Sequence, residues 1–154
     1  MRIIVLGTIQ DGGYPHVSCS EKCCKKAWED TSLRRNIASI AIIDDISKKF
    51  WIIDITPDFK DQYNILFKEL SSSYKFSGIF LTHAHIGHYS GLLLLGLEAM
   101  NTRNIPVFAM PKLITFLEDN ASINFLIGSN NIKPIQISEK EDIVLSDNLI
   151  ISSF

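Results

Sequence analysis

The chain is organised around the segment Ser77-Gly-Ile-Phe-Leu-Thr-His-Ala-His-Ile-Gly-His-Tyr-Ser-Gly91. It places His83, His85 and His88 within six residues, although the whole chain has only 4 histidines. Alternate residues of an extended segment share a face, so His83 and His85 should point the same way. Gly87 allows the backbone to turn, and His88 then lies where a helix is expected to begin. Three imidazoles directed into one space predict a transition-metal site, and the alternative is a polar turn whose histidines satisfy local backbone groups.

The composition indicates a single globular domain. A chain of 154 residues, of which 46% are hydrophobic, can bury a core of its own. Its net charge of -2 gives no reason to expect a nucleic-acid partner, and no run approaches the roughly 18 apolar residues of a membrane span. The short apolar run at residues 2–6 predicts a first strand rather than a signal peptide. A cytoplasmic location, a small-molecule substrate and no membrane partner are therefore expected.

Predicted strands and helices alternate along most of the chain. The strands are expected at residues 2–6, 36–43, 50–55, 78–81 and 105–110, with a terminal three-stranded meander at residues 133–137, 142–145 and 149–154. The helices are expected at residues 21–28, 56–70, 89–100, 111–120 and 124–127. This order predicts a mixed α/β domain in which helices are layered on a sheet.

Two of these helices lead to more specific expectations. In the helix at residues 56–70, Thr56 is the expected N-cap and Pro57 the first helical residue. The leucine-rich segment at residues 92–97 is apolar almost all round, so it is predicted to lie in the core rather than to contact a membrane or a partner. The expected buried face of the first of these helices consists of Phe59, Tyr63, Leu66, Phe67 and Leu70.

Several motifs resemble one family. Thr82-His-Ala-His-Ile-Gly-His88 resembles the His-x-His-x-Asp-His signature of the metallo-β-lactamase superfamily. The segment from Leu6-Gly-Thr8 to Gly13-Tyr-Pro15 is similar to the first loop of its ribonuclease-Z-like and PqqB-like branches, and Ile53-Asp-Ile-Thr-Pro-Asp58 resembles their strand-end aspartate. The motifs most similar to PqqB-like (coenzyme PQQ synthesis protein B-like) proteins are His85-Ile-Gly-His-Tyr-Ser-Gly-Leu92 and Ile105-Pro-Val-Phe-Ala-Met-Pro111.

The resemblance implies an αββα sandwich made of two similar halves, with metal bound between the edges of its sheets. Residues 1–154 would then be a single, incomplete metallo-β-lactamase-like domain, comprising the N-terminal half and the first strands of the second half. The family's later metal ligands would lie beyond residue 154. Because the chain ends in an apolar strand, either a homo-oligomer or a missing C-terminal half is expected to cover that strand.

The implied function is that of a metal-dependent hydrolase, which uses metal-activated water on an ester, phosphodiester or amide bond. Two alternatives remain open. One is a non-catalytic metal-binding or interaction module that has kept the fold. The other is a fragment whose site is completed by missing sequence.

The resemblance also assigns metal ligands. It implies that His83 and His85 bind a first metal ion and His88 a second. Zinc is the expected ion, manganese, iron and nickel are the alternatives, and one or two ions are expected. Gly87 stands where the family has a metal-binding aspartate, and glycine offers no ligand, so a one-metal site is an open alternative.

Two aspartates outside the motif are further candidates. By resemblance, Asp54 orients the histidine loop or the attacking water, and the alternative is a residue that only shapes the start of the helix near Thr56. Asp11 lies in the glycine-rich loop that follows the first strand, where it is a candidate for the rim of a substrate site. The alternative for Asp11 is a turn-forming Asp-Gly pair.

The three cysteines are crowded into Cys19-Ser-Glu-Lys-Cys-Cys24, and their odd number argues against a disulfide framework. The segment resembles the Cys-x-Cys-x-x-Cys pattern that binds a structural zinc in PqqB-like proteins and in the cyclic phosphodiesterases of phosphonate breakdown. Its outer cysteines match, Glu21 replaces the middle one, Cys23 is additional, and His16 is a candidate fourth ligand. The alternative is a group of free thiols on a helical turn.

Overall fold

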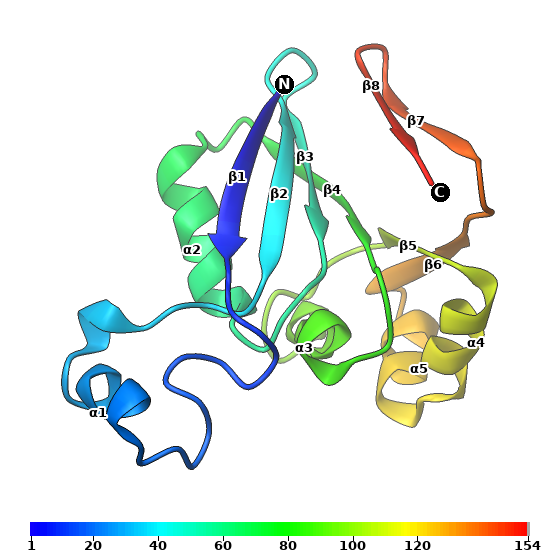
Figure 1. Cartoon of the computed structure of the whole chain (residues 1–154). Coiled ribbons are helices and arrows are strands. Elements are labelled where there is room, and N and C mark those ends of the chain that lie inside the picture. Colours follow the sequence, from blue (N-terminus) through cyan, green and yellow to red (C-terminus); the bar gives the residue numbers. More distant parts are fainter. Residues whose placement is uncertain (154) are drawn as a thin grey trace.

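A six-stranded mixed sheet forms the centre of the protein, whose structure is a computed structural model that describes residues 1–153 (Figure 1). The spatial order of the strands follows the sequence, from β1 to β6. Strands β1, β2 and β3 pair antiparallel, whereas β3 to β6 pair parallel. The six strands are β1 (Arg2–Gly7), β2 (Ser39–Asp44), β3 (Lys49–Ile53), β4 (Lys75–Phe80), β5 (Ile105–Ala109) and β6 (Ile132–Gln136).

The helical segments agree with most of the predicted positions. The predicted helices at residues 21–28, 111–120 and 124–127 are confirmed as α1, α4 and α5, and α5 is longer than predicted. Among the described residues, none of the helices is both long and apolar enough to cross a membrane. The helical segments are α1 (Lys22–Glu29), the 3-10 turn η1 (Thr31–Leu33), α2 (Phe59–Glu69), α3 (Ile86–Tyr89), the 3-10 segment η2 (Ser90–Leu95), α4 (Pro111–Asp119) and α5 (Ala121–Gly128).

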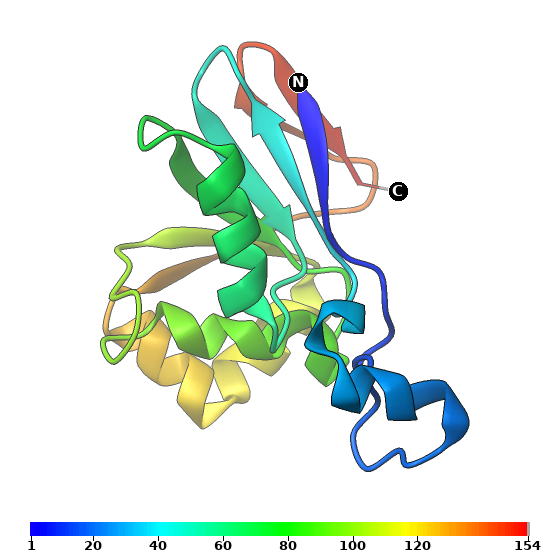
Figure 2. The ribbon, with the colours of Figure 1, turned by 90° about the vertical axis from the view of Figure 1, so that its left-hand side faces the viewer.

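The two faces of the sheet pack against different layers. Side chains alternate along β3, so that Phe50 and Ile52 belong to the larger apolar cluster and Trp51 to the smaller one. The larger cluster contains residues of α2, η2, α4 and α5. The smaller cluster includes Leu149, which belongs to a separate hairpin of β7 (Asp142–Ser146) and β8 (Leu149–Ser152). Figures 1 and 2 show α2 and this hairpin on opposite sides of the sheet.

The prediction for the start of the second helix was wrong by about two residues. Thr56 and Pro57 precede α2, and Asp58 is its N-cap. The hydroxyl of Thr56 accepts a hydrogen bond from the Asp58 amide at 3.1 Å and donates one to Oε1 of Gln62 at 2.8 Å. Thr56 therefore stabilises the turn before the helix instead of capping it.

The predicted buried face of α2 was wrong at Phe67, which is 74% exposed. Eight residues separate Phe67 from Phe59, which at about 100° per residue puts the two side chains about 80° apart around the helix axis. The buried arc extends the other way, to Gln62, which is fully buried. The Gln62 amide can be buried because it donates to the carbonyl of Ile37 at 2.7 Å and accepts from Thr56.

The prediction of one helix over residues 89–100 was also wrong. The chain instead forms the short α3 and then η2, and Leu93 and Leu97 are 50% and 66% exposed. The reason is a close approach to the segment after β3, because a Cβ atom at Gly91 would lie 2.3 Å from the carbonyl oxygen of Thr56. The Gly91 amide donates to the carbonyl of Ile55 at 3.0 Å, so these backbone groups bond to a neighbouring segment rather than continuing a helix.

The prediction of a terminal meander was wrong as well. Strand β6 pairs parallel with β5 at the edge of the main sheet, where Pro134, which has no amide hydrogen, is tolerated. Strands β7 and β8 form their own two-stranded sheet. Phe154, the last residue of the predicted final strand, lies outside the described residues.

Candidate metal centre

The candidate site lies at the carboxyl ends of β3 and β4. These two strands pair parallel, so the residues that follow them emerge at the same edge of the sheet, where α/β proteins commonly bind ligands. Asp54 follows β3, and the histidine loop follows β4. The backbone ties the two segments together, since the Asp54 amide donates to the carbonyl of Phe80 at 2.8 Å and the Ile55 amide donates to that of His88 at 2.9 Å.

Asp54 joins both ends of the histidine loop. Its Oδ1 accepts the Thr82 amide at 2.8 Å, and its Oδ2 accepts the Thr82 hydroxyl at 2.8 Å. The same Oδ2 lies 2.7 Å from Nδ1 of His88. Asp54 is only 6% exposed and has a φ of +62°, a left-handed conformation that aspartate tolerates better than most residues. The carboxylate thus contacts the histidine loop, as an orienting residue must, and does not act on α2.

The imidazoles of the loop lie side by side. Nε2 of His83 is 3.0 Å from Nδ1 of His85, and the ring centroids of His83 and His88 are 4.1 Å apart. Two nitrogens bound to one tetrahedral zinc at about 2.0 Å are separated by about 3.3 Å, so the His83 and His85 pair fits a shared ion. On the other side of the His83 ring, the Thr82 hydroxyl lies 2.8 Å from Nδ1.

His88 faces a different carboxylate from each ring nitrogen. Its Nδ1 contacts Asp54, and its Nε2 lies 3.1 Å from Oδ1 of Asp11. The ring is therefore held between Asp54 and Asp11, with a side-chain exposure of 15%. A histidine that is fixed through one nitrogen by a carboxylate is the usual form of a metal-binding imidazole.

Asp11 comes from the loop after β1 and reaches the histidine motif directly. Its Oδ2 accepts the Gly87 amide at 3.2 Å. Burial acts to raise the pKa of the Asp11 carboxyl, but the Gly87 amide and the charges of His88 and His85 outweigh it, so this pKa lies below its ordinary value. Asp11 also belongs to a turn, because the Gly13 amide donates to the carbonyl of Gln10 at 2.9 Å. Asp11 thus occupies the predicted turn, and its place at the rim of a substrate site stays a prediction.

Thr82 and the pocket next to Asp11 were not predicted from the sequence. Thr82 lies two residues after the end of β4 and directly precedes the first histidine, which is the one signal that could have identified it. The pocket measures about 380 Å³ and is lined by Asp11, Arg34, Arg35 and Asp61, among others. The residues that line the pocket come from separate segments of the chain, so no local sequence motif predicts it.

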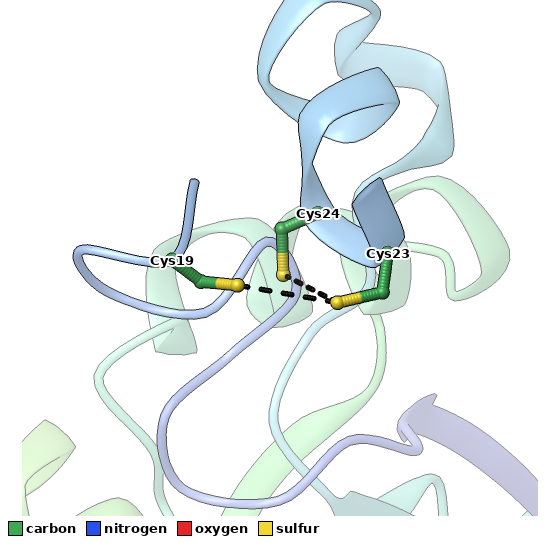
Figure 3. A group of neighbouring side chains, drawn as sticks. All are labelled: Cys19, Cys23 and Cys24. Carbon is green, nitrogen blue, oxygen red and sulfur yellow. Dashed lines mark hydrogen bonds between the residues drawn. The ribbon is translucent and has the colours of Figure 1, made fainter. Parts of the chain in front are cut away.

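The three cysteines converge at the start of α1 (Figure 3). Sγ of Cys23 lies 4.0 Å from that of Cys19 and 3.9 Å from that of Cys24. Two thiolates on one tetrahedral zinc, each at about 2.3 Å, are separated by about 3.8 Å, so the spacing fits that ion. All three are free thiols.

His16 does not complete the cysteine group. Its backbone amide donates to Sγ of Cys24 at 3.4 Å, whereas Nδ1 of its ring lies 2.9 Å from the carbonyl of Val17. Within residues 1–153, the three cysteines form the only group of at least three His, Cys, Asp or Glu side chains whose ligand atoms all lie within 4.8 Å of one another. A structural zinc on the cysteines therefore stays a prediction, and its fourth ligand is not provided by the His16 ring in this structure.

Comparison with known sequences points to one group of proteins. No protein-family model matches the chain. Coenzyme PQQ synthesis protein B of Rhodopseudomonas palustris (strain BisB5) is 26% identical over 157 residues, which cover 97% of this chain and 49% of that protein. The protein of the same name from Xanthomonas campestris pv. campestris (strain B100) is 34% identical over 99 residues, 60% of this chain and 33% of that protein. An octanoyltransferase of Porphyromonas gingivalis is 37% identical over 92 residues, but these cover only 17% of it.

Solved structures agree on the fold. The Zn(2+)-bound PqqB of Methylobacterium extorquens matches with a TM-score of 0.81 at 21% identity, over 99% of this chain and 55% of that one. A diphosphatase of the PhnP family matches with a TM-score of 0.67 at 26% identity, over 93% and 52%. This chain thus spans about half the length of the relatives that align over nearly all of it. The expected mixed α/β fold is confirmed as that of metallo-β-lactamase fold proteins, and so is the resemblance to PqqB, to which this chain is similar in sequence over nearly all of its own length.

Proposed function

We propose that this chain provides part of the active site of a metal-dependent hydrolase, which acts on an ester, phosphodiester or amide bond. The fold is of the type found in such hydrolases. The observation that carries the proposal is the buried Asp54, which contacts Nδ1 of His88 and both donors of Thr82. A buried carboxylate that aims an imidazole in this way is what a metal ligand requires, and a polar turn does not need it.

In this proposal the metal ligands are Nε2 of His83, Nδ1 of His85 and Nε2 of His88. Zinc is the proposed ion, since the structure of PqqB from Methylobacterium extorquens is described as Zn(2+)-bound. A bound zinc would lower the pKa of a water molecule to about 7 and polarise the bond under attack. Because the chain spans about half of its relatives, the remaining ligands are proposed to come from outside residues 1–154.

The chain's own residues have defined tasks. Asp54 and Thr82 hold the imidazoles in place, and the loop carrying His83 and His85 is exposed, so a substrate can reach it. The pocket beside Asp11 is lined by two arginines and three aspartates, so it offers polar groups of both signs next to the histidine loop.

The test is hydrolysis of a panel of synthetic substrates by the purified protein. The panel contains bis-p-nitrophenyl phosphate, p-nitrophenyl esters and an anilide, each with zinc, with manganese and with a chelator. Turnover should require metal and disappear in the His85→Ala variant, while His16→Ala, which changes a histidine outside the loop, should retain it. A protein that holds no metal after gentle purification, and takes up neither zinc nor manganese, would refute the proposal.

The second candidate is a metal-binding module without turnover. The observation in its favour is Gly87, which offers no carboxylate at the position where the superfamily has one. A protein that binds metal through His83 and His85 but hydrolyses nothing in the panel would support this candidate over the first.

A further inference from the structure

The space beside Gly87 is filled by Asp11. A Cβ atom built on Gly87 would lie 2.6 Å from Cγ of Asp11 and 2.9 Å from its Oδ1, distances that real Cβ atoms do not adopt. Asp11 therefore keeps this position only because residue 87 has no side chain. The carboxylate that is missing from the motif at residue 87 is replaced, at nearly the same place, by a carboxylate 76 residues away in the sequence.

The Asp11 carboxylate is also oriented as a metal ligand would be, with one oxygen fixed and the other next to His88. Its Oδ2 is anchored by the Gly87 amide at 3.2 Å, which leaves Oδ1 next to Nε2 of His88 at 3.1 Å. Nδ1 of His88 is already used by Asp54, so Nε2 is the nitrogen left for a metal ion. The Asp11 side chain is 32% exposed, so the pair of atoms faces a site that ions and water can reach.

The loop that carries Asp11 is built to hold it there. The Gly12 amide donates to Oε1 of Gln10 at 2.7 Å, and a Cβ atom on Gly12 would lie 2.3 Å from the ring of His16. Gly13 has a φ of +75°, in the left-handed region that favours glycine. Substituting either glycine would displace the turn, and Asp11 with it.

We propose that Asp11 is a metal ligand that acts together with Nε2 of His88, in place of the carboxylate that residue 87 lacks. The separation of 3.1 Å between Oδ1 and Nε2 suits two ligands on one ion at about 2.0–2.2 Å each. The inference rests on the proposed metal site and goes beyond it, because it gives the His88 side a complete pair of ligands despite Gly87. It also implies that residues 11 and 87 exchange roles, so that a carboxylate is needed at one of them and excluded at the other.

The test is titration of the purified protein with Mn²⁺, followed by electron paramagnetic resonance of the free ion. Manganese is chosen because it prefers oxygen and imidazole ligands to thiolates, so the cysteine group does not contribute. Asp11→Asn should weaken binding about tenfold or more, since it removes a charged ligand but keeps the size of the side chain. Asp61→Asn, which removes a charge in the neighbouring pocket, should leave the affinity within about twofold of the original.

The decisive variant moves the carboxylate. Asp11→Gly alone should lose affinity as Asp11→Asn does, and the double variant Asp11→Gly/Gly87→Asp should regain most of it. Circular dichroism and thermal unfolding confirm that each variant is folded. Unchanged Mn²⁺ affinity in Asp11→Asn, with affinity still lost in His83→Ala, would refute the role of Asp11 and leave the metal site intact. Absence of Mn²⁺ and Zn²⁺ binding in the unaltered protein would refute both.

Discussion

Asp54 is the residue on which the candidate site depends most. Asp54→Asn keeps the shape of the side chain and tolerates the left-handed φ, but it weakens the contact that orients His88. We expect metal affinity to fall about 10–100-fold, the usual cost of losing the partner of a metal-binding histidine. Competition with a chromophoric chelator measures this.

Asp58, four residues after Asp54, provides a matched control. Asp58 accepts the Ile37 amide at 2.8 Å, so Asp58→Asn also removes a carboxylate that is bonded to a neighbouring segment. It should leave the metal affinity unchanged. Equal affinities in Asp54→Asn and the unaltered protein would show that Asp54 does not orient a ligand.

For single residues, the sequence predicted which side chains lie close to one another better than it predicted their hydrogen-bond partners. The spacing of His83, His85 and His88 and the strand-end position of Asp54 are local signals, and the structure places His83 next to His85 and His88 next to Asp54. The dependence of Asp11 on Gly87 is a contact across 76 residues. No local pattern encodes such a pair, so Asp11 was expected either at the rim of a substrate site or in an Asp-Gly turn.

The turn from α3 into η2 packs against the segment that follows β3. Gly91→Ala would place a methyl group 2.3 Å from a backbone carbonyl oxygen that cannot move away easily. We expect a loss of about 1–3 kcal/mol in the free energy of unfolding, as for other overpacked sites. Urea denaturation measures it.

Gly128→Ala is the comparison for that variant. Gly128 ends α5, and a Cβ atom there would meet no atom within 4 Å. Alanine should be neutral or slightly stabilising at this position, because it lowers the conformational freedom of the unfolded chain. Similar losses in both variants would show that the effect at Gly91 does not come from crowding.

Elements with a simple period were predicted well, and those shaped by distant contacts were not. Strands β1 to β5 and helices α1, α4 and α5 follow from alternation or helical spacing in the sequence. The segment at residues 89–100 is apolar enough for a helix, but backbone hydrogen bonds to Ile55 prevent one. The terminal strands look alike in sequence, and only pairing with β5 separates β6 from the hairpin.

A buried carboxylate links the terminal hairpin to the main sheet, beside the apolar contacts of Leu149. Asp44, at the end of β2, is 3% exposed and accepts hydrogen bonds from Ser146 of β7 at 2.5 Å and from Ser47 at 2.7 Å. These hydroxyls hold the pKa of Asp44 well below its ordinary value of 3.8. A carboxylate of this kind stabilises the folded state when it is charged.

The stabilisation by Asp44 should therefore depend on pH in a defined direction. It is fully present above the ordinary pKa of 3.8 and is lost as the pH falls below that value toward the folded-state pKa. Asp44→Asn should thus lower the urea midpoint at pH 7, and the difference from the unaltered protein should shrink below pH 4 or so. Asp147→Asn, at an exposed position of the same hairpin, should show little difference at either pH. A difference for Asp44→Asn that stays constant with pH would contradict this account.

Metal binding by His83 and His85 is tested by the zinc content of the folded protein with and without this histidine pair. The unaltered protein and His83→Ala/His85→Ala are purified in the same way from zinc-supplemented medium, dialysed, and analysed by inductively coupled plasma mass spectrometry. Zinc on the cysteine group is common to both and cancels in the difference. If His83 and His85 bind zinc, the unaltered protein should hold more zinc per chain than the variant, up to one additional ion. Equal zinc contents in the two folded proteins would contradict it.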